Sequence, residues 1–156
     1  MPTYPPFEVK IDNREVRQAL ERLLNRVEDM TPVMEDIARS LGNLAEDAIQ
    51  AETDPWGDRW PDLSDAYVER PREDGGRGGD AHPILQRDGL LAASLAHQGD
   101  AHSAAVSIGR VYGAAVTLGD PERNLPPRRV LPVSGTGELA PGAEEDILDL
   151  VRHYLR

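Results

Sequence analysis

The chain has 156 residues, of which 17 are lysine or arginine and 28 are aspartate or glutamate, giving a formal net charge of −11. This length suits one domain that buries roughly two-thirds of its unfolded surface, and the acidic balance argues against nucleic-acid binding through clustered cations. The absence of cysteine excludes disulfides, thiolate metal sites and a cysteine nucleophile. With no leader-like start and no long apolar run, we expect a soluble protein made in a cytoplasm, with no membrane partner.

The amino-terminal segment is predicted to form a strand followed by an amphipathic helix. Residues 7–11 alternate apolar and polar side chains, as a short strand does. Asp12 and Glu15 then have the spacing of a capping box, which marks the start of a helix. The helix has one apolar stripe, which we expect to lie on a core. Its members are Val16, Ala19, Leu20, Leu23, Leu24 and Val27.

A second helix is predicted from the pair Thr31 and Pro32, a capping hydroxyl followed by a proline at the first helical position. Its apolar spacing continues to about Ala51. Gly42 inside this helix costs about 1 kcal/mol relative to alanine. This indicates either a close crossing by another element at Gly42 or a tolerated weak point, and we favour the crossing.

Both tryptophans lie in residues 54–67, between the helical region and a glycine-rich stretch. Continuous helix is interrupted there by Pro55, Gly57 and Pro61. We therefore expect a packed, irregular loop. Two interpretations of Trp56 and Trp60 stay open, because aromatic side chains fill the edge of a small core and also anchor partners at interfaces.

Residues 69–83 contain four glycines and alternating charges, with almost nothing to bury. This composition predicts a flexible loop. Arg70, Arg72 and Arg77 are its candidate contacts with a partner. The GGRGGD stretch is not expected to bind a nucleotide, because no Gly-Lys-Ser/Thr follows and no strand precedes it.

The middle of the chain is predicted to contain a short helix and a strand. Residues 84–98 have an apolar pattern in which Asp88 or Gly89 can start a short helix. Residues 104–108 alternate as a strand does. Residues 111–118 fit either a returning strand or a short helical turn, and periodicity does not separate these two alternatives.

Residues 125–142 are expected to be extended, because each proline keeps its predecessor out of the helical region. Adjacent side chains on an extended segment point to opposite sides. One of Arg128 and Arg129 can therefore face its own subunit while the other reaches the carboxylates of a neighbour. The alternative is a pair of solvated arginines.

A final helix is predicted near Pro141, with acidic residues in its first turns and Arg152 and Arg156 at its end, as the helix dipole favours. Its apolar face comprises Ile147, Leu148, Val151, Tyr154 and Leu155. The fold class is therefore expected to be α+β, with a small mixed or antiparallel sheet packed against two or three helices and long extended loops. Residues 1–156 are expected to form one domain.

No catalytic, metal or cofactor motif is present. The histidines at 82, 97, 102 and 153 lack the spacing that places two imidazoles on one helix face. An acidic loop could be interpreted as a calcium site or an acid–base pair, but it lacks the EF-hand ligand spacing. Its members are Asp54, Asp58, Asp62 and Asp65. Carboxylates next to prolines more often cap turns, so we expect no enzyme.

Several short motifs, in order, resemble the virion-morphogenesis or tail completion proteins of phage Mu-like and related tailed phages. Gly57, Trp60, Leu63 and Ser64 match a Gly-x-x-Trp-x-x-Leu-Ser segment. A segment with an Ile-Leu pair and a later glycine is matched by Ile84, Leu85, Gly89 and Leu90. Two further segments match with departures, at Tyr112, Ala115 and Gly119 and at Pro127, Arg128, Arg129, Val130 and Leu131. The likeness covers nearly the whole chain.

The resemblance implies a structural virion protein of the neck or tail end, assembled in the host bacterial cytoplasm. Such a subunit would form a homo-oligomeric ring, a hexamer, that completes or terminates the tail and joins it to the head. Its partners would be further copies of itself, the tail tube protein and the head–tail connector proteins. DNA would pass through the lumen without sequence-specific binding, and residues 69–83 and 120–136 are candidate arms. The alternatives are a non-structural assembly factor and a small metal-dependent enzyme that uses the acidic loop.

Overall fold

The structure, a computed structural model, describes residues 13–69 and 83–156. Helices and one two-stranded antiparallel sheet make up its regular structure, which confirms the α+β class. The predicted strand at residues 7–11 lies outside the described residues, as does nearly all of the predicted loop at 69–83. The elements are α1 (Arg14–Glu28), α2 (Thr31–Ala51), α3 (Asp65–Val68), α4 (Leu90–Ala93), β1 (Leu95–Gly99), β2 (Ala104–Ile108), α5 (Gly113–Leu118), η1 (Pro121–Arg123) and α6 (Pro141–Leu155).

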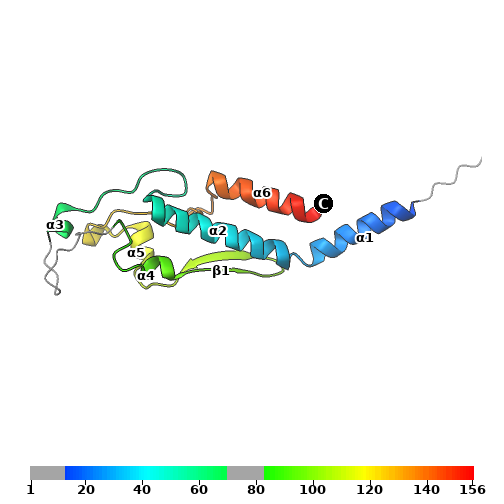
Figure 1. Cartoon of the computed structure of the whole chain (residues 1–156), viewed down its shortest axis with the longest axis horizontal. Coiled ribbons are helices and arrows are strands. Elements are labelled where there is room, and N and C mark those ends of the chain that lie inside the picture. The colour runs from blue at the N-terminus through cyan, green and yellow to red at the C-terminus, as the bar shows by residue number, and fades with distance from the viewer. Residues whose placement is uncertain (1–12, 70–82) are drawn as a thin grey trace, which may run out of the picture.

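Helix α2 is the centre of the fold, lying between α6 and the β1–β2 hairpin (Figure 1). The helix is confirmed at its predicted bounds, but the predicted cap is wrong: Thr31 is the first helical residue, and its N–H donates to the Asp29 carboxylate. Two groups of buried residues line α2. One contains Ala45, Ala48, Ile49, Trp60, Ile84 and Val130, and the other contains Val33, Ile37, Leu41, Ala140 and Ala143.

The hairpin covers one side of α2. Leu95 pairs with Ile108 and Gly99 with Ala104, so the two strands are in register over their full length. The close crossing predicted at Gly42 is confirmed, because a Cβ there would lie 3.0 Å from the His97 ring. The strand predicted at 104–108 is confirmed, whereas β1 was not predicted because its residues had been assigned to an apolar pattern suggesting a helix.

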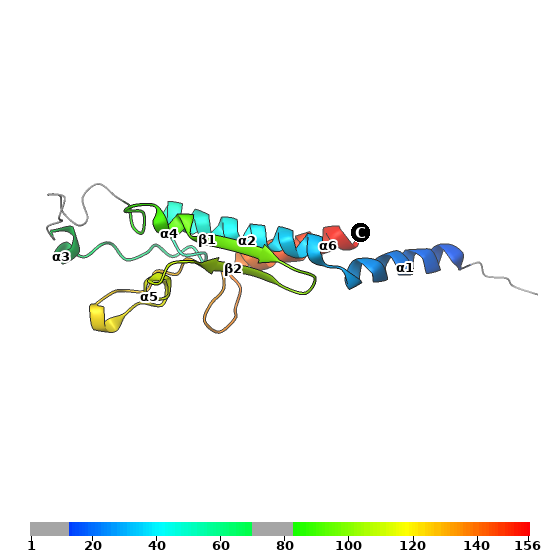
Figure 2. The same ribbon diagram turned by 90° about the horizontal axis from the view of Figure 1, so that it is seen from below.

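The remaining elements gather at the end of the molecule opposite α1 (Figures 1 and 2). The short helix predicted after Gly89 is confirmed as α4, with the N–H of Leu90 donating to the Asp88 carboxylate. Of the two alternatives for residues 111–118, the helical one holds, as α5. Residues 125–140 contain neither helix nor strand, as their prolines predicted, but they are not extended throughout. The chain turns back between Val133 and Leu139, which form an isolated antiparallel bridge.

Helix α1 differs more than any other described element from what its sequence predicted. It begins at Arg14 after Asn13, without a side-chain cap, and Asp12 lies outside the described residues. The expectation that its apolar stripe lies on a core is wrong, because no α1 residue is buried. The large apolar side chains of the stripe are 39 to 60% exposed. The helix extends away from the body (Figures 1 and 2), and the Arg26 guanidinium reaches the Tyr154 carbonyl of α6 at 3.2 Å.

Gly99, at the end of β1, provides a stability test of the hairpin–α2 contact. A Cβ at this position would clash with the backbone of Met34 and Glu35, so Gly99→Ala forces the backbones apart. We expect a loss of about 1 to 3 kcal/mol or more, as for other over-packed cores. Gly135→Ala is the matched control, since a Cβ there meets nothing within 4 Å. Equal urea midpoints for the two variants would show that the hairpin does not pack on α2 as described.

Candidate functional site

The tryptophan loop is a rigid turn built around the Asp54 carboxylate. This side chain is buried, and its Oδ1 accepts the N–H groups of Trp56 at 2.9 Å and Asp58 at 3.0 Å. The turn requires a positive φ of 96° at Gly57, a conformation that favours glycine. The predicted packed, irregular loop is thus confirmed, and Asp54 acts there as a turn-capping group.

Arg129 closes this turn from the extended 125–140 segment. Its guanidinium lies 3.1 Å from the Asp54 carboxylate and stacks over the Trp56 ring at 4.8 Å from the ring centroid. Such stacking suits the planar guanidinium better than a lysine ammonium. The interpretation of Arg129 as a merely solvated arginine is therefore wrong. A contact of its remaining exposed surface with a neighbouring subunit stays a prediction.

Trp60 and Arg128 hold the loop to the body. Trp60 is 3% exposed, and its indole N–H donates to the Arg129 carbonyl at 3.1 Å. Arg128 is 4% exposed and donates from Nε and Nη2 to the Pro61 carbonyl and from Nη2 to the Asp62 carbonyl. Burial lowers the pKa of Arg128, although the side chain stays protonated because its ordinary value is so high. Both residues are therefore parts of the subunit core, and neither is exposed as an anchor.

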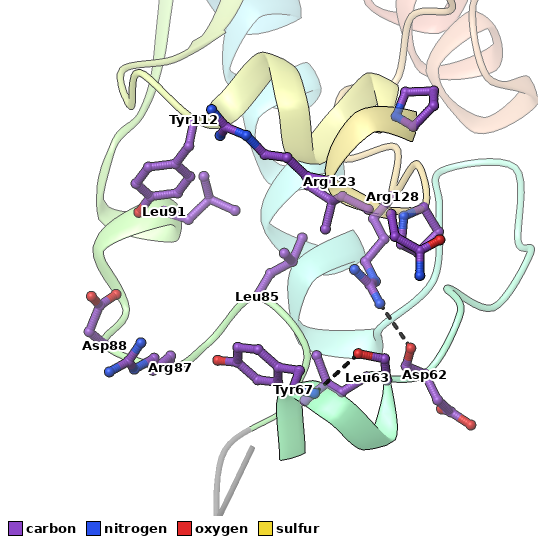
Figure 3. Close-up of a pocket in the computed structure, with 15 residues that line it drawn as sticks. Asp62, Leu63, Tyr67, Leu85, Arg87, Asp88, Leu91, Tyr112, Arg123 and Arg128 are labelled. Atoms are coloured by element: carbon purple, nitrogen blue, oxygen red, sulfur yellow. Dashed lines mark hydrogen bonds between the residues drawn. The ribbon is translucent and has the colours of Figure 1, made fainter. Parts of the chain in front are cut away.

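Arg128 also lines a cleft of about 780 Å³ next to the loop (Figure 3). Apolar side chains from four separated segments make up most of its lining, which also includes arginines and aspartates. Figure 3 shows Tyr67, Leu85, Leu91 and Tyr112 around the cleft. The apolar lining comprises Leu63, Tyr67, Leu85, Leu91, Tyr112, Pro121, Leu125 and Pro126. This volume lies in the range of protein binding pockets.

One protein-family model covers the whole described fold, from α1 to α6. The family model of the phage virion morphogenesis family matches residues 11–156. The chain belongs to the phage virion morphogenesis family. No curated protein and no solved structure matches the chain.

In this virion morphogenesis protein, two carboxylates of the acidic loop have partners within the chain. Among residues 13–69 and 83–156, no group of three or more histidines, aspartates or glutamates is placed to hold a metal ion. The Asp54 carboxylate accepts backbone hydrogen bonds within the turn, and the Asp62 carboxylate lies 3.5 Å from the Arg59 guanidinium. Within the same residues, no helix is long and apolar enough to cross a membrane.

The loop of the virion morphogenesis protein could be predicted from its sequence, whereas its cleft could not. Of the predicted partner contacts, Arg70, Arg72 and Arg77 lie outside the described residues, so their role stays a prediction. The cleft could not be predicted, because its lining comes from segments far apart in the chain that no periodic pattern links. The sequence shows the apolar stripe of α1, but it does not show that the described residues leave this stripe exposed.

Proposed function

We propose that the protein is a structural subunit of the phage neck or tail end, forming a homo-oligomeric ring that completes the tail and joins it to the head. The family match supports a role in virion morphogenesis. The observation that carries the ring is α1, an amphipathic helix whose apolar stripe stays exposed among residues 13–69 and 83–156. A contiguous uncovered apolar surface of this kind is typical of an interaction site.

The charge of the chain fits this placement. A net charge of −11 repels phosphates, so a ring wall of such subunits lets DNA slide through the lumen without sequence-specific binding. The partners on either side of the ring would be the tail tube protein and the head–tail connector proteins. Six copies is the number that the family resemblance suggests.

The use of Asp54 argues against the metal-dependent enzyme. Its carboxylate accepts two backbone N–H groups and pairs with Arg129, so it has a full structural role in the turn. No observation favours a non-structural assembly factor over a ring subunit. We therefore propose a non-enzymatic role without cofactors.

The proposed function is tested by electron microscopy of particles made without this protein. We expect full heads and separate tails of normal length, which rejoin when the purified protein is added. Overlong tails would assign the protein to length termination. Normal virions without the protein would contradict a structural role in the neck or tail.

A further inference from the structure

Three helices meet at Asp29, the residue that follows α1. Its N–H donates to the Asn25 carbonyl at 3.3 Å in the last turn of α1, and its carboxylate accepts the Thr31 N–H at 3.1 Å at the start of α2. Its own carbonyl accepts the Tyr154 hydroxyl of α6 at 2.7 Å. Asp29 is therefore the joint at which the direction of α1 is set.

A second hydrogen bond joins α1 to the same tyrosine. The Arg26 guanidinium donates to the Tyr154 carbonyl at 3.2 Å. This carbonyl lies in the last turn of α6, which ends at Leu155, so no N–H of the helix is available to it and a cation is favoured there. Tyr154 thus holds α1 against α6 with its side chain and with its backbone.

The two sides of this contact differ in how firmly they are held. The Tyr154 ring packs against the buried residues shared by α2 and α6, and so does the side chain of Met30. Helix α1, in contrast, has no buried residue, and both of its hydrogen bonds to Tyr154 lie at exposed positions. Hydrogen bonds between exposed groups exchange with bonds to water, so the net contribution of each is small. The body of the subunit is thus fixed, whereas α1 is held by bonds that water can replace.

The break between α1 and α2 is required by Pro32. In a continuous helix the pyrrolidine ring would clash with the Glu28 carbonyl, and proline lacks the N–H that should bond to this carbonyl. The backbone of Asp29 is accordingly extended, with φ of −124° and ψ of 94°. Only residues 29–30 separate the two helices. A change in the direction of α1 therefore needs rotation at these two residues alone, as in other hinges.

We propose that Tyr154 is a latch that fixes the direction of α1, and that α1 pivots about Asp29 when the latch opens. In the closed state both bonds to Tyr154 are formed, and α1 points away from the body in one direction (Figures 1 and 2). In the open state water replaces both bonds, while the Tyr154 ring stays packed on the core. The latch lies within a single copy of the chain, so this inference does not rest on the proposed ring.

Spin labels on two introduced cysteines measure the direction of α1, because the chain has no cysteine of its own. Gln18 on α1 lies about 16 Å from Asp29 along its helix, and Glu46 on α2 lies about 24 Å from Met30. Both labelled positions, Gln18 and Glu46, are exposed. Their separation, measured by double electron–electron resonance, therefore changes with the angle between the helices. Labelled full-length protein is diluted with unlabelled wild type, so that only distances within one copy are measured.

Tyr154→Phe in the labelled protein removes the hydroxyl and keeps the ring. It should raise the ratio of open to closed molecules about two- to tenfold and broaden the distance distribution. Arg26→Gln should also broaden the distribution, and the double variant should broaden it most. Arg22→Gln is the matched control, because it removes the same charge from an exposed position of α1 one turn before Arg26. It should leave the distribution of the labelled parent unchanged.

Equal distributions for Tyr154→Phe and Arg22→Gln would overturn the latch. A labelled parent whose distribution is already as broad as that of the double variant would overturn it too, because the bonds would then not hold α1. Circular dichroism of each variant shows whether α1 stays helical. Broadening accompanied by a loss of helical signal would mean that the bonds stabilise the helix itself, and this result would overturn the pivot.

Discussion

Replacing Trp60 with alanine is expected to lower the free energy of unfolding by about 3 to 5 kcal/mol, the range for a fully buried tryptophan. The indole packs with Ile49, Ile84 and Val130, and its N–H donates to the Arg129 carbonyl. The substitution therefore leaves a cavity and an unpaired carbonyl together. Urea unfolding followed by circular dichroism measures the loss.

Two further substitutions separate burial from hydrogen bonding at Trp60. Trp60→Phe keeps most of the ring and loses the N–H donor, so we expect an intermediate loss. Leu118→Ala removes a side chain that is 70% exposed and should change stability by less than about 0.5 kcal/mol. If Trp60→Ala were as stable as Leu118→Ala, Trp60 would have to lie at the surface of the free subunit.

Arg128→Met is expected to cost about 2 to 4 kcal/mol, because it removes the donors to two carbonyls at a buried position while keeping a side chain of similar length. The lost bonds are those to Pro61 and Asp62. They hold the end of the tryptophan loop against the extended segment. Thermal unfolding followed by circular dichroism should show the decrease.

Arg128→Lys distinguishes charge from geometry at this position. An ammonium on a flexible stem cannot reproduce the fork of a guanidinium, so lysine should recover only part of the lost stability. The control is Arg123→Met, since the Arg123 side chain is 80% exposed and its ion pair with Asp120 contributes little. A loss for Arg128→Met no larger than for Arg123→Met would contradict the described bonds.

The sequence predicted well those elements whose signal is local. The starts of α4 and α6 were set by Asp88, Gly89 and Pro141, each of which acts within a few residues. The alternation of residues 104–108 likewise identified β2, and the prolines after residue 125 identified a segment without helix or strand, although not its turn between Val133 and Leu139. In these cases the chain's own periodicity or backbone chemistry decides the structure.

Other features depend on tertiary contacts that local patterns do not contain. Strand β1 contains Leu95, Ala96 and His97, which fit a helix as well as a strand until β2 supplies the pairing. The stripe of α1 predicted a buried face, but amphipathicity does not show whether the cover belongs to the same molecule. Arg128 and Arg129 were expected on opposite sides, yet their partners in the tryptophan loop lie more than 60 residues away.

The position of α2 between α6 and the hairpin has a consequence for synthesis of the chain. The side of α2 that carries Val33, Ile37 and Leu41 packs against α6. Helix α6 begins at residue 141, about 90 residues after α2 ends. At about 5 to 20 residues per second, translation leaves this side without the part of its cover that α6 supplies for roughly 5 to 20 s. The nascent chain is thus most prone to aggregate in this interval, and chains that stop before Pro141 remain in that state.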